Sequence, residues 1–291
     1  MSNLIFHEYP ELRKPKVVAG FSGWANAGEI SSGAVAYLKS KLNPTKYAEF
    51  DPEPFFDFTN ARPHGVITDG VIKSLKFVSN EFFYWENASG EHDVVLFLGT
   101  EPHLKWRRFA EDFFSAFQES DPDELILLGS FYDSTPHTRD PIVSAAVNDS
   151  GMRATLEEFD LQFTDYDGPV SIHSVLEHAC VELGIPSISL WTGTPHYLPT
   201  ANPKAWHAVL DRLLPILGIE IDLRDLRRRG NRLDKQVEQA LSQNPKLRRY
   251  VRQLESALQV KEDKEEEPLR SDEIIKSLED FLRQRQQGNE D

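Results

Sequence analysis

The sequence has few cysteines and no long apolar run. Cys180 is the one cysteine among 291 residues, which excludes an intrachain disulfide and a cysteine-based zinc site. A membrane-spanning helix needs about 18 apolar residues in succession, and the sequence contains no such stretch. Its first residues also lack the basic patch and apolar core that are typical of a signal peptide. We therefore expect a cytoplasmic protein without membrane contact.

Basic side chains are scarce relative to acidic ones. Lys and Arg together number 32 and Asp and Glu 47, giving a formal net charge of −15. An acidic surface repels a phosphate backbone, so we expect no nucleic-acid partner. The hydrophobic content of 40% is sufficient for a packed core and argues against global disorder.

Nucleotide-binding fingerprints are absent at the place where they are most expected. A strand-like run, 17–21, enters the loop 23–29, which opens a helix-like run, 30–42. Such a loop often holds a ligand in α/β domains, and the first N–H groups of the helix can bind an anion. However, the loop matches neither G-x-G-x-x-G nor Gly-Lys-Ser/Thr, so we expect no nucleotide and no cofactor.

The ligand-binding candidates in this loop also have structural explanations. The two glycines can simply permit a tight turn, and the glutamate can complement the dipole at the start of the helix. The candidates are Gly23, Trp24, Asn26, Gly28 and Glu29.

Strand-like and helix-like segments alternate up to about Leu217. Continuous apolar strands between amphipathic helices predict an α/β fold, with a mostly parallel sheet flanked by helices in three layers. The predicted strands are 17–21, 46–50, 66–69, 72–78, 81–85, 93–98, 124–129, 142–147 and 187–191, with a hairpin turn at Ser79-Asn80. The predicted helices are 30–42, a phenylalanine-rich helix containing Trp106, 172–183 and 205–217.

The composition changes after Ile221, which predicts a core domain over 1–221 and a helical extension over 222–291. Leucines and valines recur at helical spacing in a charged background, and Asn244-Pro245 separates two helices. A charged linker follows at 262–268, and Ser271 can cap a last helix. We expect the apolar stripe of the extension to pack on its own core or on another chain.

Polar residues gather where predicted strands end. Glu101 and His103 follow one strand, His137 and Arg139 follow another, and His196 follows a third. The carboxyl ends of parallel strands share one edge of a sheet, so these residues and the asparagine of the first loop are predicted to converge in a polar pocket.

This set allows acid–base chemistry or anion binding, and each member has an alternative role. Glu101-Pro102 is also typical of the first turn of the following helix. His137 and Arg139 can form a structural salt bridge or contact another subunit. His173 and His178 lie five residues apart on a predicted helix and point in different directions, so they predict no metal pair. No metal site is expected.

Several of these motifs together resemble the PAC2 family, the relatives of proteasome assembly chaperone 2. The motifs are Gly23–Glu29, Glu101-Pro102 with Trp106 downstream, Gly129 after a buried strand, and Pro136–Arg139, in this order. The resemblance covers about residues 1–217, and the helical extension resembles that of actinobacterial members. It implies a core similar to phosphorylases and hydrolases, homo-oligomers with trimers favoured, and a chaperone-like role in assembling proteasome α-subunits.

The favoured interpretation is therefore a non-enzymatic assembly chaperone or interaction protein with protein partners. The alternative is a small-ligand-binding protein, or a hydrolase- or phosphorylase-like enzyme that uses the strand-end loops. Family members that dock on the proteasome often end in a hydrophobic residue, a tyrosine and one more residue. This sequence ends in Gly288-Asn289-Glu290-Asp291, so docking through a C-terminal tail is not expected.

Overall fold

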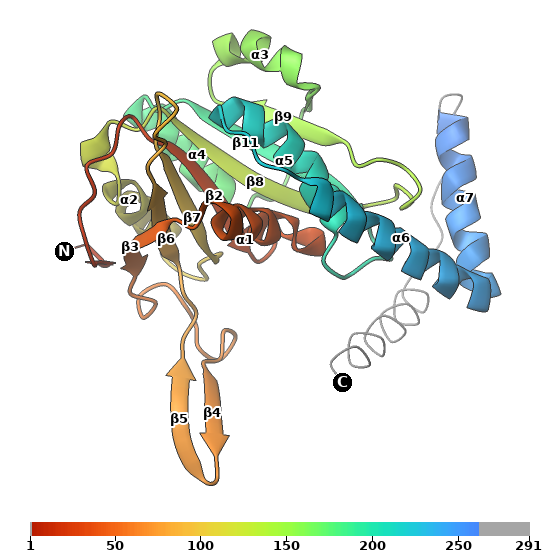
Figure 1. The fold of residues 1–291 in the computed structure, drawn as a ribbon, viewed down its shortest axis with the longest axis horizontal. Coiled ribbons are helices and arrows are strands. Elements are labelled where there is room, and N and C mark those ends of the chain that lie inside the picture. Colours follow the sequence, from red (N-terminus) through yellow and green to blue (C-terminus); the bar gives the residue numbers. More distant parts are fainter. Residues whose placement is uncertain (1, 262–291) are drawn as a thin grey trace.

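The computed structural model describes residues 2–261, which form a nine-stranded sheet with helices on both faces and a separate hairpin (Figure 1). The strands of the main sheet are β1 (Leu4–Phe6), β2 (Lys16–Ser22), β3 (Thr45–Phe50), β6 (Glu81–Trp85), β7 (Val94–Thr100), β8 (Glu124–Asp133), β9 (Val143–Val147), β10 (Gln162–Phe163) and β11 (Ser187–Pro195). The hairpin consists of β4 (His64–Thr68) and β5 (Val71–Lys76). The helices are α1 (Ile30–Leu42), α2 (Trp106–Ser115), α3 (Ser150–Leu156), α4 (Ile172–Leu183), α5 (Pro203–Leu217), α6 (Arg224–Gln243) and α7 (Pro245–Lys261), with short 3-10 turns at Ala27–Glu29, Gln118–Ser120 and Glu157–Phe159.

The centre of the sheet is parallel and its margins are mixed. The strand order is β1-β3-β6-β7-β2-β8-β11-β9-β10, and the four central strands β7, β2, β8 and β11 run parallel. Strand β6 pairs antiparallel with β7 because the eight-residue connection between them is too short for a parallel crossover. The predicted α/β sheet is confirmed for this parallel centre.

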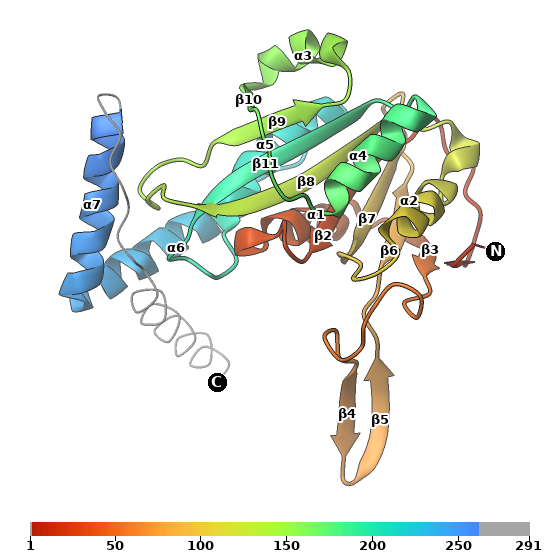
Figure 2. The same ribbon diagram turned by 180° about the vertical axis from the view of Figure 1, so that it is seen from behind.

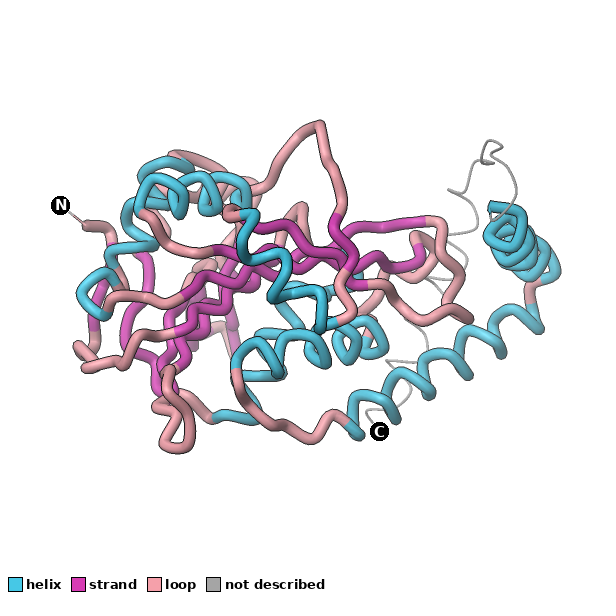
Figure 3. The backbone as a smooth tube through the Cα atoms, turned by 90° about the horizontal axis from the view of Figure 1, so that it is seen from above, coloured by secondary structure: helices cyan, strands magenta, loops and turns pink. Residues whose placement is uncertain are grey.

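Two apolar cores lie on opposite faces of the sheet. Helices α1 and α5 cover one face, and α2 and α4 cover the other (Figures 2 and 3). Along β2 the side chains alternate between them, since Val18 belongs to the first core and Val17 and Ala19 to the second. The second core is rich in phenylalanine, and the rings of Phe50 and Phe109 stack with centroids 4.3 Å apart.

Helices α6 and α7 carry a third apolar cluster that packs on the loop after β11. Leu233, Val237 and Val251 lie with Tyr197 and Leu198 in this cluster. Asn244 separates the two helices, as predicted, and its side chain accepts a hydrogen bond from the N–H of Leu247. Leu223 and Leu226, at the start of α6, belong to the core under α1 and α5. The boundary at residue 221 stays a prediction, while the charged linker, the last helix and the C-terminal residues lie outside the described residues.

The predicted turn at Ser79-Asn80 is wrong. Strand β5 pairs with β4 across the turn at Asp69-Gly70, and β6 pairs with β3 and β7 in the main sheet. Asn80 is instead buried, and its side-chain amide exchanges two hydrogen bonds of 2.9 Å with the backbone of Thr100. Strands β1 and β10 and helix α3 were not predicted, because they are too short to have a clear hydrophobic period. Within residues 2–261 no helix is long and apolar enough to cross a membrane.

Gly33 sets how closely α1 approaches α5. A Cβ atom built there lies 2.2 Å from the indole of Trp206, which belongs to α5. We expect Gly33→Ala to lower the free energy of unfolding by about 1–3 kcal/mol, since overpacking outweighs the gain in helix propensity. Gly65→Ala is the matched control, because a Cβ there has open space. Urea denaturation measures both, and a Gly33→Ala variant as stable as the original chain would contradict this packing.

Candidate functional site

The loop between β2 and α1 is held by its own polar groups. Gly23 and Gly28 have φ of +131° and +59°, values that favour glycine. The Asn26 side chain accepts from the N–H of Ser32 at 3.0 Å and donates to the Ser32 hydroxyl at 2.9 Å. Ser130 on β8 donates its hydroxyl to the carbonyl of Ala27. The side chain of Asn26 therefore fastens the start of α1.

The other two candidates of this loop, Trp24 and Glu29, are exposed. The backbone at Glu29 has a φ of +51°, and its N–H donates to the carbonyl of Asn26. The glutamate thus closes the turn before α1 by its backbone.

The Glu101 carboxylate joins two segments that are distant in the sequence. One oxygen accepts from the N–H of Trp24 at 3.1 Å, and the other accepts from the N–H of Ile172 at 2.9 Å. Ile172 is the first residue of α4, where a carboxylate is favoured by the unpaired N–H groups and the helix dipole. The proposed cap at the start of the next helix is wrong, because Glu101 caps α4 and α2 begins only at Trp106.

His103 lies apart from the other histidines. Its Nδ1 accepts a hydrogen bond from the N–H of Asp57 at 3.1 Å, and its ring makes an edge contact with Phe56. The backbone N–H of His103 donates to the carbonyl of Phe55. This histidine therefore supports the segment between β3 and the hairpin.

His137 is buried against the tyrosine that follows β11. The Tyr197 hydroxyl oxygen accepts from the backbone N–H of His137 at 2.7 Å and lies 2.8 Å from its Nδ1. Because the N–H already uses that oxygen as an acceptor, the hydroxyl proton is free to be donated to Nδ1. Nε2 lies 3.3 Å from Oε1 of Glu238 on α6, outside hydrogen-bond geometry. Burial lowers the pKa of His137, while the carboxylates of Asp234 and Glu238 oppose this shift.

His196 fastens the second helix of the extension. Its Nδ1 lies 2.8 Å from the carbonyl of Asp133, and a carbonyl only accepts, so Nδ1 carries the proton. Nε2 then accepts from the hydroxyl of Tyr250 on α7. His196 thus joins a strand-end loop to α7, whereas His137 joins the loop after β8 to the loop after β11.

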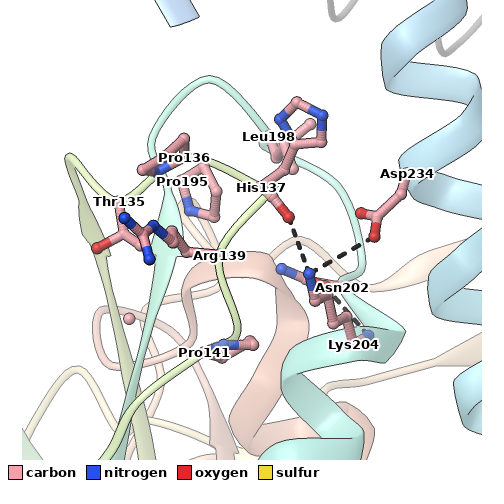
Figure 4. Close-up of a pocket in the computed structure, with 11 residues that line it drawn as sticks. Thr135, Pro136, His137, Arg139, Pro141, Pro195, Leu198, Asn202, Lys204 and Asp234 are labelled. Carbon is pink, nitrogen blue, oxygen red and sulfur yellow. Dashed lines mark hydrogen bonds and ion pairs between the residues drawn. The ribbon is translucent and has the colours of Figure 1, made fainter. Parts of the chain in front are cut away.

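A shallow pocket lies between these loops and α6 (Figure 4). The Lys204 ammonium group donates to the carbonyl of His137 at 2.9 Å and lies 3.5 Å from carboxylate oxygens of Asp234 and Asp140. The Arg139 guanidinium lines the same pocket and makes no hydrogen bond or ion pair with the described side chains. Figure 4 shows Arg139 and Lys204 on opposite sides of the pocket. A guanidinium can bind a small anion, although Asp234 adds negative charge on the side of Lys204.

The predicted convergence of six polar residues is only partly present. His137 and Arg139 line one pocket, and His137 and His196 both pack edge-on against the ring of Tyr197. Asn26, Glu101 and His103 are engaged elsewhere. Sequence reasoning missed the partners on the far side: Tyr197, Lys204, Glu238 and Tyr250. Each of these residues lies at least 54 positions from the residue that it contacts, so no spacing in the sequence signals them.

The remaining histidines of α4 and the cysteine do not contribute to the pocket. His173 is fully buried between the rings of Phe21 and Trp191, and burial lowers its pKa to about 4. His178 is exposed and lies 3.7 Å from Glu182, so the two histidines point apart as predicted. Cys180 is buried in the core, and burial raises its thiol pKa to about 12. No group of three or more possible metal ligands occurs among residues 2–261.

Replacing Glu101 tests whether its carboxylate is a structural clamp. Glu101→Gln turns one acceptor oxygen into an NH2 group that faces a backbone N–H, so we expect a loss of about 1–3 kcal/mol in the free energy of unfolding. Glu29→Gln is the matched control, because that exposed side chain should change stability by less than about 0.5 kcal/mol. Thermal and urea unfolding report both variants, and equal stability of the two would exclude the clamp.

Comparisons with family models and with solved structures place the chain in a family. The PAC2 family model matches residues 20–241. A PAC2 family protein from Streptomyces avermitilis is 32% identical, with 77% of this chain and 95% of that chain covered and a TM-score of 0.71. None of the curated proteins compared with this chain matches it.

Two further structures have names that mention the proteasome. A proteasome-assembly chaperone homologue from Mycobacterium tuberculosis is 33% identical, covers 81% of this chain and 99% of its own, and has a TM-score of 0.73. An archaeal proteasome activator from Pyrococcus furiosus is 21% identical, with coverage of 82% and 98% and a TM-score of 0.68, which shows a common fold. By the family match and by these identities, the chain belongs to the PAC2 family.

Proposed function

We propose that this chain is a non-enzymatic assembly chaperone or interaction protein, related in function to proteasome assembly factors. The observation that carries the proposal is that most of the polar side chains at the strand ends make structural hydrogen bonds. Asn26, Glu101, His137 and His196 each make hydrogen bonds that hold a loop or helix in place. A side chain held in this way is a poor proton shuttle, because catalysis needs it to reach a substrate.

The relatives support a protein partner for this chain. One is named a proteasome-assembly chaperone homologue and another an archaeal proteasome activator. We extend this role to the present chain, with proteasome subunits as partners and the cytoplasm as its location. We also infer that the chain acts as a homo-oligomer, with a trimer favoured.

Binding to proteasome subunits is directly testable with purified proteins. We expect the full chain to bind isolated proteasome α-subunits from the same organism and to change the rate at which they form rings, measured by native gel electrophoresis and sedimentation. The matched variant is Arg139→Ala, which removes an exposed side chain and should leave this binding unchanged. An unrelated protein of similar negative charge controls for nonspecific attraction. The proposal is refuted if the chain does not bind the α-subunits and does not change the rate at which they form rings.

The pocket beside α6 supports a second candidate, a small-anion-binding protein. Its specific observation is that Arg139 and Lys204 both line the pocket and that the Arg139 guanidinium has no hydrogen bond or ion pair within residues 2–261. An arginine offers a bidentate fork that suits carboxylate or phosphate groups. Under this alternative, a hydrolase- or phosphorylase-like activity would use the same strand-end loops.

A thermal-shift screen separates the two candidates. A ligand that binds only the folded state raises the melting temperature, and at 100 times its Kd it adds about 2.7 kcal/mol of stability. If the pocket binds anions, phosphate or carboxylates should raise the melting temperature of the original chain. The Arg139→Ala variant should lose that shift. An unchanged melting temperature with all of these compounds would exclude the anion-binding candidate.

A further inference from the structure

Helix α6 separates its positive charges from its negative ones. Its three acidic residues each lie against a polar group of the core, and the pairs are Asp225 with Tyr37, Asp234 with Lys204 and Glu238 with His137. The same helix carries six arginines and lysines, and all of them are exposed. The acidic side chains of α6 thus contact the core, while its basic side chains face solvent.

Three of these cations follow one another along the outer side of α6. Leu226 and Val237 are buried and mark the inner side of the helix. Arg228, Arg232 and Lys235 lie on the opposite side at steps of four and three residues, and we call them the basic stripe. At a rise of about 1.5 Å per residue, neighbouring members are about 4.5–6 Å apart along the helix axis.

The basic stripe has no compensating partner in the part of the chain that the structure describes. Arg228, Arg232 and Lys235 make no hydrogen bond or ion pair within residues 2–261, whereas Arg224, one turn earlier, is held by Asp222 at 2.7 Å. Like charges four residues apart repel each other, and cations near the start of a helix oppose its dipole. A sequence that keeps these cations against both effects indicates that a partner requires them.

The start of α7 extends the positive charge. Lys246, Arg248, Arg249 and Arg252 are exposed, and no acidic residue occurs between positions 239 and 254. Helices α6 and α7 meet at one end of the molecule, away from the central sheet (Figures 1 and 3). Because the whole chain has a net charge of −15, this end is a basic region of an acidic protein.

The buried side of α6 and the net charge of the chain limit the kind of partner. A helix that lies on a membrane buries its apolar side in lipid, but Leu226 and Val237 are 0% exposed and already packed on the protein. A nucleic acid would bring a long phosphate backbone against the acidic remainder of the chain, which repels it. A short acidic segment of a protein meets neither obstacle.

We propose that the basic stripe binds an acidic helix of a partner protein, with carboxylates at steps of four and three residues. Two helices that lie side by side have the same rise per residue, so one carboxylate can stand beside each cation. The guanidinium groups of Arg228 and Arg232 can each take a carboxylate in a bidentate pair. This inference goes beyond the proposed function, because it needs neither a homo-oligomer nor a proteasome subunit.

A labelled peptide tests whether the full chain binds an acidic helix. The probe is a fluorescein-labelled peptide of repeated Glu-Ala-Ala-Ala units, and its control has Gln in place of each Glu. We expect the Glu peptide to bind in fluorescence anisotropy titrations and the Gln peptide not to bind. Because exposed ion pairs are screened by salt, the affinity for the Glu peptide should fall as the salt concentration rises.

Charge reversal on α6 locates the binding surface. Arg228→Glu combined with Lys235→Glu should weaken binding of the Glu peptide at least about tenfold, because each change replaces an attraction with a repulsion. The matched control is Arg62→Glu combined with Arg107→Glu, which changes the net charge equally at two exposed arginines outside α6 and α7. This control should leave the affinity nearly unchanged.

Arg228→Glu by itself separates binding from folding. It places a carboxylate four residues before Arg232, where an attraction replaces the repulsion between two arginines, and near the start of the helix, where the dipole favours it. We therefore expect the melting temperature to stay the same or rise while the affinity for the Glu peptide falls. A lower melting temperature would contradict the repulsion on which the inference depends.

Several outcomes would overturn the proposal. It is refuted if the Glu peptide does not bind, or if the double variant on α6 binds it as well as the original chain does. Duplex DNA or phosphatidylserine vesicles that bind more tightly than the peptide through the same residues would assign the basic stripe to a different class of partner. Self-association lost in the double variant, measured by sedimentation velocity, would assign it to a contact between copies. Binding to proteasome α-subunits is measured separately, so its failure leaves this test intact.

Discussion

The loop after β2 has to leave a strand that is paired on both edges and buried on both faces. The buried backbone groups at such a place need hydrogen-bond partners inside the protein. Asn26, Ser130 and Glu101 provide these partners, and each binds a backbone group of this loop or of the helix it enters. The polar side chains that a catalytic site at this edge would need are therefore engaged in hydrogen bonds to the backbone.

The need to satisfy buried polar groups also explains why the helical extension packs against the core. His137 and His196 lie on long loops after β8 and β11, and each bonds to a tyrosine hydroxyl. Burial lowers the pKa of His137, which favours the neutral ring whose Nδ1 can accept a hydrogen bond from the Tyr197 hydroxyl. Helices α6 and α7 then cover these contacts with Leu233, Val237 and Val251. The extension acts as a cover over the strand ends, and the pocket with Arg139 lies at its margin.

Elements with a strong local signal were predictable from the sequence. Helix α1 has the predicted bounds, Ile30–Leu42, and the apolar runs at 93–98 and 124–129 form central strands. The tail of β8, 130–133, was assigned to a loop because it follows Gly129 and ends in Asp133. Side-chain partners were not predictable, since the bond of Glu101 to Ile172 depends on how α4 crosses the sheet. The same holds for the tyrosines that bind the two histidines.

The two edges of the main sheet expose less unpaired backbone than the hairpin does. Strand β1 has three residues and β10 has two, and such short edge strands offer little backbone for pairing with another chain. The hairpin has longer strands, free backbone on both outer edges, and a face made of Gly65, Ile67, Ile72 and Leu75. The hairpin therefore offers more open backbone to another chain than either edge of the main sheet does.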